Sequence, residues 1–269
     1  MNTAVVTSCS AQGWTQYGRR FVETFCAYWP REVVLHVYSE DLRPANLGDM
    51  LGRDLGREVF FHDLRAPFLD RHAGNLRAQG REQHSGDYGW TPNKVAQGYN
   101  FRLDAFRFSK KVFAIQAAAR CHSAGWLCWV DADVVTFDTV PPDLLERMLP
   151  ADAALSCLDR GDYHSECGFV CYNLDHPATR PFIEAFAALY ETENVFQLKE
   201  WHDSWVFDWL RKKMQVPVYA IPHCSNKQPF INSELGCVMD HLKGASKIKG
   251  KTLLKHMLAG HAHAYWSKA

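Results

Sequence analysis

Two acidic residues, Asp131 and Asp133, interrupt an apolar run that extends from Gly125 to Phe137. An unpaired carboxylate inside a buried strand costs several kcal/mol or more, so these acids need a partner. Side chains two residues apart on an extended chain share one face, and Ala132 between them points away. Two like charges so close repel each other unless a cation lies between them, and oxygen ligands suit Mg²⁺ or Mn²⁺. The pattern therefore predicts a divalent metal site.

The Asp-x-Asp tripeptide also occurs in turns and on surfaces, where its acids are simply solvated. Apolar residues on both sides favour the metal interpretation in this chain over that alternative. In an open α/β sheet, ligands bind at the carboxyl ends of strands. We therefore expect Asp131 and Asp133 to lie at a strand end.

A second informative stretch, from Met239 to Lys251, places His241, Gly244 and Lys247 at intervals of three residues. A glycine lets backbone N–H groups approach a phosphate, and a lysine supplies a point charge. The alternative is a solvated basic tail. Because this segment has few apolar residues, we expect residues 241–251 to be mobile until an anionic ligand and its metal order them.

Four further polar residues are candidates for contact with a ligand. Thr7 and Ser8 end the first expected strand, where small side chains let a ligand approach, although a simple turn is the alternative. Glu166 opens a later strand with an acid. Asp203 is either the N-cap of the helix that follows it or a carboxylate of the site.

Lys110 lies on an apolar stripe of the clearest expected helix, residues 101–120, four residues after Phe106 and three before Phe113. A lysine in that place must either extend its ammonium group to solvent or meet an anion. Its neighbour Lys111 is expected to point away from this stripe into solvent.

The elements that must position these residues follow one another in β-α-β order. Strands are expected at 4–7, 33–38, 59–61, 153–158, 166–173 and 216–222 and in the run that leads into Asp131, and helices at 15–29, 101–120, 140–148, 179–191, 205–214 and 252–265. This order favours an α/β fold with a mostly parallel central sheet, flanked by helices and joined by right-handed crossovers. Residues 64–99 show no periodicity, and we expect an irregular substrate loop there.

Length and composition indicate a single domain, residues 1–269, with ample apolar content for a core: 47% of the chain is hydrophobic and 13% aromatic. Lysine plus arginine equal aspartate plus glutamate at 30 each, so no global charge indicates a nucleic-acid partner. The nine cysteines form no CxxC pair, and those in apolar runs (Cys26, Cys128, Cys157 and Cys171) are interpreted as small buried side chains. The chain shows no transmembrane run and no signal peptide, and we expect a cytoplasmic protein.

Taken in their order along the chain, the motifs described above resemble those of glycosyltransferases with the GT-A (Rossmann-like) fold. The resemblance is strongest to the retaining glycogenin/galactosyltransferase group, glycosyltransferase family 8. Asp131-Ala132-Asp133 matches the DxD motif of that family. Lys110 is similar in context to the basic helix residue that precedes the motif. The resemblance extends, in short motifs, over nearly the whole chain.

Three more motifs carry the resemblance, and each of them departs from it in part. The strand from Glu166 to Val170 resembles an asparagine-x-glycine strand, with Glu166 in place of the asparagine. His241-x-x-Gly244-x-x-Lys247 matches the C-terminal motif, but lacks the proline and tryptophan that usually follow. Asp203 falls near an Asp-Gln pair of the family, with Ser204 in place of the glutamine.

The resemblance implies that a sugar moves from a nucleotide-sugar donor, with a UDP-sugar expected, to a saccharide or another hydroxyl-bearing acceptor, with retention. It implies Asp131, Asp133 and His241 as ligands of Mn²⁺ or Mg²⁺, donor contacts from Thr7, Ser8, Lys110, Asp131, Ala132, Gly244 and Lys247, catalytic roles for Asp203 and Glu166, and acceptor contacts from Trp201 and His202. The metal and Lys247 would stabilise the charge that grows on the leaving nucleoside diphosphate.

Three other functions stay open at this stage. An inverting glycosyltransferase of the same fold would use Glu166 or Asp203 as a base near the acceptor hydroxyl. A sugar-phosphate nucleotidyltransferase usually has a Gly-rich basic loop near its first strand, whereas residues 7–13 contain one glycine and no lysine. A non-enzymatic carbohydrate-binding protein would not need a DxD motif and a downstream histidine.

Overall fold

A seven-stranded sheet runs through the middle of the computed structural model, which describes residues 2–41, 56–81, 98–123 and 125–267. The strand order is β3-β2-β1-β4-β7-β6-β8, with bounds β1 Thr3–Cys9, β2 Val34–Ser39, β3 Val59–Asp63, β4 Trp126–Val130, β6 Leu155–Leu158, β7 Glu166–Asn173 and β8 Val218–Ala220. β7 is antiparallel to both of its neighbours, and the other pairs in this sheet are parallel. The predicted mostly parallel α/β sheet is confirmed.

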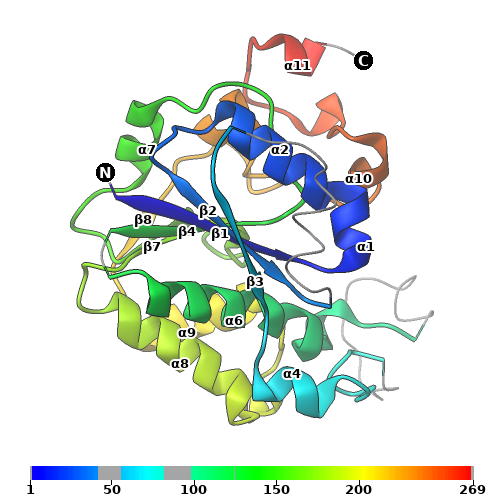
Figure 1. Cartoon of the computed structure of the whole chain (residues 1–269). Coiled ribbons are helices and arrows are strands. Elements are labelled where there is room, and N and C mark those ends of the chain that lie inside the picture. Colours follow the sequence, from blue (N-terminus) through cyan, green and yellow to red (C-terminus); the bar gives the residue numbers. More distant parts are fainter. Residues whose placement is uncertain (1, 42–55, 82–97, 124, 268–269) are drawn as a thin grey trace.

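Helices cover both faces of the sheet (Figure 1). One face carries α4 (Pro67–His72), α6 (Ala105–Cys121), α8 (Thr179–Glu191) and α9 (Asp203–Lys213), and the other carries α1 (Ala11–Gly13), α2 (Arg19–Tyr28) and α7 (Pro142–Met148). A π-helical turn, η1 (Trp14–Gly18), joins α1 to α2. The 3-10 segments are η2 Phe101–Leu103, η3 Asn194–Gln197, η4 Glu234–Cys237 and η5 Leu254–His256, and the tail holds α10 (Ser246–Lys249) and α11 (Ala264–Ser267).

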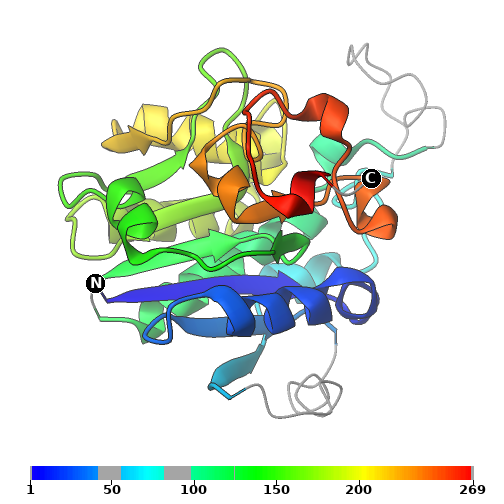
Figure 2. The same cartoon turned by 90° about the horizontal axis from the view of Figure 1, so that it is seen from above.

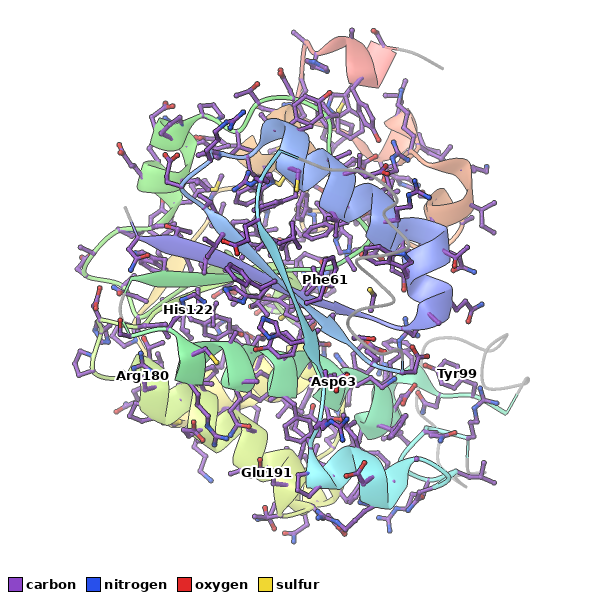
Figure 3. The ribbon with its side chains drawn as sticks, viewed as in Figure 1. Phe61, Asp63, Tyr99, His122, Arg180 and Glu191 are labelled. Carbon is purple, nitrogen blue, oxygen red and sulfur yellow. A yellow bond between two sulfur atoms is a disulfide. The ribbon has the colours of Figure 1, made fainter. Side chains whose placement is uncertain are left out.

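Each face of the sheet has its own hydrophobic core, because successive side chains of a strand point to opposite faces. Along β1, Ala4 and Val6 join the core beneath α6, while Val5 and Cys9 join the core beneath α2. α6 is buried on two sides, as its two apolar stripes predict. Arg180 of α8 donates hydrogen bonds to the carbonyls of Ala119 (2.7 Å) and His122 (2.5 Å), which ties α8 to the end of α6 where Figure 3 labels Arg180 and His122.

A second, two-stranded sheet decides where the tail lies. β5 (Val134–Thr136) follows Asp133 directly, and β9 (Met239–His241) pairs with it antiparallel, so that Val134 stands opposite His241. The tail packs back on the α2 face, where Trp266 is buried and Arg20 of α2 donates a hydrogen bond to the Gly250 carbonyl (3.0 Å). The orange to red tail helices lie at the end of the molecule opposite the N-terminus (Figure 2).

Several expectations about elements need correction. Residues 64–99 are not wholly irregular, because α4 forms at Pro67–His72, where a proline occupies the first helical turn; residues 82–97 lie outside the described residues. The helix expected at 252–265 is replaced by two short segments, η5 and α11. The edge strand expected at 216–222 is confirmed as β8, the last strand of the sheet.

Cys128 and Cys171 are buried as expected but are not separate thiols. They stand directly opposite each other on β4 and β7, with their Cα atoms 4.0 Å apart, and they are joined by a disulfide. Their positions in two different apolar runs contain no information on this pairing, which depends on strand register. In the part of the chain that the structure describes, none of the helices has the length and apolarity required to span a membrane.

Candidate active site

The carboxyl ends of the parallel strands meet at one edge of the sheet, and several of the predicted polar residues lie there together with Glu40, which was not predicted. Ser8 lies near the end of β1, Glu40 follows β2, and Asp131 follows β4. Because β7 runs antiparallel, its first residue, Glu166, lies at the same edge. The backbone N–H of Asp131 donates to the Gly168 carbonyl (3.0 Å), which fixes the DxD segment against β7.

His241 reaches the DxD segment through the pairing of β9 with β5. Its Nε2 lies 3.4 Å from Asp131 Oδ2 and 3.1 Å from Asp133 Oδ1, and its side chain is buried. The backbone N–H of Leu242 donates to the Asp133 carbonyl (3.0 Å), which holds the two segments in register. The structure thus brings together the three residues predicted as metal ligands, although more than 100 residues separate His241 from the two aspartates along the chain.

Lys247 adds a cation to this cluster. Its Nζ lies 2.6 Å from Asp133 Oδ2 and 4.8 Å from the ring centroid of Tyr17 in η1. A single π-helical turn within a helix often marks a functional site, and Tyr17 here lines the same pocket as Lys247. The Gly244 backbone has φ +54°, a left-handed conformation that favours glycine and turns the chain between His241 and Lys247.

Lys111, which was expected to face solvent, is instead the central cation of the site. Its Nζ lies 2.9 Å from Asp131 Oδ1 and 2.6 Å from Asp203 Oδ2, and it donates to the Cys167 carbonyl (2.8 Å). Only 14% of its side chain is exposed. The sequence did contain a signal, since Lys111 lies three residues after Phe108 and four before Ile115 on the second apolar stripe of α6.

Lys110 meets an anion, but that anion belongs to the protein. Its Nζ lies 2.9 Å from Glu40 Oε2, and the Ser8 hydroxyl donates to Glu40 Oε1 (2.9 Å). Lys110, Ser8 and Glu40 all line the pocket described below. The proposed donor contact of Lys110 therefore stays a prediction, and a donor would have to share Lys110 with Glu40.

Glu166 is part of the buried charge cluster and not a free base in this state. It is ion-paired with Lys243, and its Oε1 lies 3.4 Å from His241 Nδ1. A Cβ atom at Gly168 would lie 2.3 Å from His241 Cε1, so only glycine leaves room for the imidazole here. Gly168 and Lys243 were not among the predicted site residues; the asparagine-x-glycine resemblance contained a signal for Gly168 alone.

The charges of the cluster stabilise one another. Burial opposes ionisation of Asp131, but Lys111 and His241 lower the pKa of its carboxyl group well below the ordinary value. Burial likewise opposes charge on Glu166, and Lys243 with His241 nevertheless lowers its pKa. Burial disfavours a charged His241, yet Asp133 and Asp131 raise its pKa well above the ordinary value. Metal binding would therefore have to displace the His241 proton, because only the neutral imidazole is a ligand.

The residues present fit a divalent cation. The ligand atoms of Asp131, Asp133 and His241 lie within 4.8 Å of one another. Adjacent ligands of an octahedral Mg²⁺ at 2.0–2.1 Å are about 3 Å apart, close to the 3.1 and 3.4 Å observed. The Oδ1 atom of Asp133 is buried and has no hydrogen-bond partner among the described residues, although His241 lies beside it. A buried carboxylate oxygen left in this way is a site for a cation.

A pocket of about 870 Å³ opens over this cluster. Of the predicted residues it is lined by Ser8, Lys110, Asp131, Ala132, Asp133, Glu166, Asp203, His241, Gly244 and Lys247. Thr7, Trp201 and His202 are buried and are not among its lining residues. Asp203 is the first residue of α9 and not its N-cap, which is His202, so the alternative of a capping role is wrong.

Residues that the sequence interpretation did not single out also line the pocket. Tyr17, Arg107 and Trp129 contribute to its walls along with Lys111 and Lys243. Trp129 precedes Asp131 by two residues on the same face, and its indole N–H donates to Asp131 Oδ1 (2.6 Å). That period-two relation was readable from the sequence, whereas the approach of η1 and Lys243 depends on tertiary structure.

No protein-family model and no curated protein matches this chain. Among solved structures, it is similar to the apo form of the glycosyltransferase GlyE of Streptococcus pneumoniae TIGR4, with TM-score 0.48, 13% identity, and coverage of 81% of this chain and 45% of that one. It is also similar to mouse xyloside xylosyltransferase 1, apo form (TM-score 0.48, 13% identity, 81% and 84% coverage). The bifunctional WbbM apo structure follows at TM-score 0.46, 11% identity, and 90% and 46% coverage. The chain thus spans about half the length of GlyE and WbbM, and at these identities we argue function from the site itself.

Proposed function

We propose that this protein is a metal-dependent glycosyltransferase that moves a sugar from a nucleotide-sugar donor to a hydroxyl-bearing acceptor. One observation carries the proposal: Asp131, Asp133 and His241 converge, with Lys247 beside them, in a pocket of about 870 Å³ at the carboxyl edge of the sheet. Two carboxylates, an imidazole and a lysine are the groups that a metal–diphosphate complex requires. The names of the similar structures agree with this class of enzyme.

Within this proposal, Asp131, Asp133 and His241 would hold Mn²⁺ or Mg²⁺, which would supply positive charge for the diphosphate leaving group. Lys247 exchanges its contact with Asp133 for a phosphate oxygen. Ser8, with its small side chain, and Gly244, which has none, leave room for the donor at the pocket wall. Lys111 holds the carboxylates of Asp131 and Asp203 in place through its two ion pairs.

Retention of configuration and a UDP-sugar donor are proposed on the resemblance to the glycogenin/galactosyltransferase group. The inverting alternative is favoured by one specific observation, namely that the carboxylates of Glu166 and Asp203 both line the pocket. Glu166 in this state is engaged by Lys243, and Asp203 by Lys111. NMR detection of the first-formed product anomer separates the two stereochemical outcomes.

The primary test is calorimetry of nucleoside-diphosphate binding with and without Mn²⁺, in the natural protein and in Asp133→Ala. We expect binding that requires Mn²⁺ in the natural protein and is lost in the variant, with turnover reduced by at least 10²–10³-fold or so. Asp143→Ala on α7, which removes an exposed carboxylate, is the matched control and should change neither. Full activity of Asp133→Ala would sink the proposal, and metal-independent binding would favour a nucleotide-binding protein without this chemistry.

A further inference from the structure

A second group of metal-binding side chains lies apart from the DxD cluster. Glu200 and His202 precede α9 on either side of Trp201, and His164 comes from the connection between β6 and β7. His202 Nε2 lies 2.9 Å from Glu200 Oε2, and His164 Nε2 lies 3.8 Å from the same oxygen. The three ligand atoms all lie within 4.8 Å of one another. Neither His164, Glu200 nor His202 lines the pocket at the DxD segment.

The spacing of these atoms matches a tetrahedral centre. Ligands at the 2.0–2.1 Å typical of zinc stand about 3.3 Å apart at the edges of a tetrahedron. The two measured edges, 2.9 and 3.8 Å, lie on either side of that value. The 3.8 Å separation between His164 Nε2 and Glu200 Oε2 is too long for a hydrogen bond. The imidazole rings of His164 and His202 stand 5.3 Å apart at 70°, in an edge-to-face arrangement.

Two of the three side chains in this cluster are buried, and the third is partly exposed. The side chains of Glu200 and His202 are 6% and 8% exposed, while that of His164 is 38% exposed. An ion could therefore enter from the His164 side, and water could supply a fourth ligand there. The other oxygen of Glu200 lies 3.3 Å from Arg102 Nη1, an outer-shell partner that leaves Oε2 directed at the histidines.

The backbone that holds these ligands is tied down on both sides. The Trp201 N–H donates to the Arg102 carbonyl (2.7 Å), and the Tyr190 hydroxyl donates to the Trp201 carbonyl (2.9 Å). Phe101 and Phe108 contact the His202 ring with centroid distances of 5.8 Å each. Ligands held on a fixed backbone lose little freedom when an ion binds.

We propose that His164, Glu200 and His202 form a zinc site with an open position for water. Two imidazoles and one carboxylate are a donor set for Zn²⁺, because nitrogen donors outnumber oxygen donors here, whereas carboxylates outnumber the imidazole at the DxD cluster. The site fixes the start of α9, because His202 directly precedes Asp203, whose carboxylate contacts Lys111. The ion thereby braces one wall of the main pocket, and its presence does not depend on the reaction proposed above.

The test uses the full chain in the Asp133→Ala background, so that the DxD cluster cannot supply the zinc signal. Chelator-treated protein is dialysed against Zn²⁺ and analysed by elemental mass spectrometry, and Co²⁺ is added in parallel to record the visible absorption of a tetrahedral centre. We expect about one Zn²⁺ per chain. His202→Ala should weaken binding by more than the roughly 10–100-fold that loss of an outer-shell partner costs.

His164→Ala provides a second variant, since His164 is the most exposed of the three and its loss leaves the core intact. His256→Ala removes an exposed histidine on η5 and is the matched control. Unchanged Zn²⁺ binding in both His202→Ala and His164→Ala, or an equal loss in His256→Ala, would overturn the proposal. Absence of bound Zn²⁺ in the Asp133→Ala parent would overturn it as well and would leave a hydrogen-bonded Glu200–His202 pair.

Discussion

The two adjacent lysines of α6, Lys110 and Lys111, form ion pairs with different carboxylates. Lys111 bridges the carboxylates of Asp131 and Asp203, while Lys110 contacts the carboxylate of Glu40 alone among the residues that the structure describes. A buried carboxylate that loses its cation is costly, and the side chain of Asp203, which pairs with Lys111, is only 5% exposed. Lys111 is therefore the more consequential residue of the pair.

We expect Lys111→Met to lower the free energy of unfolding by about 3 kcal/mol, since Asp131 and Asp203 lose their shared partner. Lys110→Met keeps the same stem and should cost less than Lys111→Met, because Lys110 neutralises one carboxylate, that of Glu40, whereas Lys111 neutralises two. Urea unfolding of both variants measures the difference. Equal changes in the free energy of unfolding would show that Lys111 contributes no more to stability than Lys110 does.

Glu166 has two possible roles that a single substitution separates. If it orients His241, Glu166→Gln should weaken Mn²⁺ binding by roughly 10–100-fold, as for other outer-shell partners of metal-bound histidines. If it is instead a base, Mn²⁺ affinity should be unchanged while kcat falls. Electron paramagnetic resonance of free Mn²⁺ in a titration measures the first quantity. We expect the first outcome, because Oε1 lies 3.4 Å from His241 Nδ1.

At the scale of elements, a chain of three histidines links β2, β3 and α6 on the side of the sheet away from the DxD cluster. His36 Nδ1 lies 2.8 Å from His62 Nε2, and His36 Nε2 lies 2.9 Å from His122 Nε2. A neutral imidazole can donate once and accept once, so three neutral rings satisfy these contacts. Burial, with contributions from His122 and His62, lowers the pKa of His36 to about 4.

Because His36 is held neutral in this chain of histidines, we expect the free energy of unfolding to fall in acid. Between pH 6.5 and about 4 the unfolded state binds a proton at His36 and the folded state does not, so stability falls as the pH falls through this window. The loss is on the order of 3 kcal/mol at the lower end. We expect His36→Phe, which retains the stacking on Phe60, to unfold with a shallower pH dependence over this range. Parallel curves for the variant and the natural protein would contradict the assignment.

At the scale of the whole molecule, the tail closes the site by folding back across the carboxyl edge of the sheet. β9 is already buried in place, so the expectation that the whole of residues 241–251 awaits a ligand is too broad. Beyond it, Ile248 in α10 is 93% exposed, and the segment is held to the body by the contacts of Lys247 with Asp133 and of Gly250 with Arg20.

We therefore predict that residues 243–251 become protected from hydrogen exchange when metal and nucleoside diphosphate bind, because Lys247 would then contact the diphosphate in addition to the segment's other contacts with the body. Residues 239–242 should be protected with and without ligand, and they serve as an internal control. Exchange across 243–251 that stays the same at saturation would show that Lys247 does not contact the donor.

The sequence by itself determined the features that depend on local periodicity and residue type. Strand-forming runs in β-α-β order predicted the α/β sheet, and two carboxylates set in an apolar run predicted a site at a strand end. The spacing of His241, Gly244 and Lys247 at intervals of three residues indicated a second site segment. Each of these signals is contained within a short stretch of the chain.

Only the tertiary structure decided which distant residues meet. The pairing of β9 with β5 sets His241 against Asp133, and the antiparallel course of β7 brings Glu166 and Gly168 to the same edge. The partner of Lys111, the disulfide of Cys128 and the convergence of His164 with His202 depend likewise on strand register and helix packing. Contacts of this kind join segments whose separation in sequence has no fixed relation to their separation in space, so no local pattern encodes them.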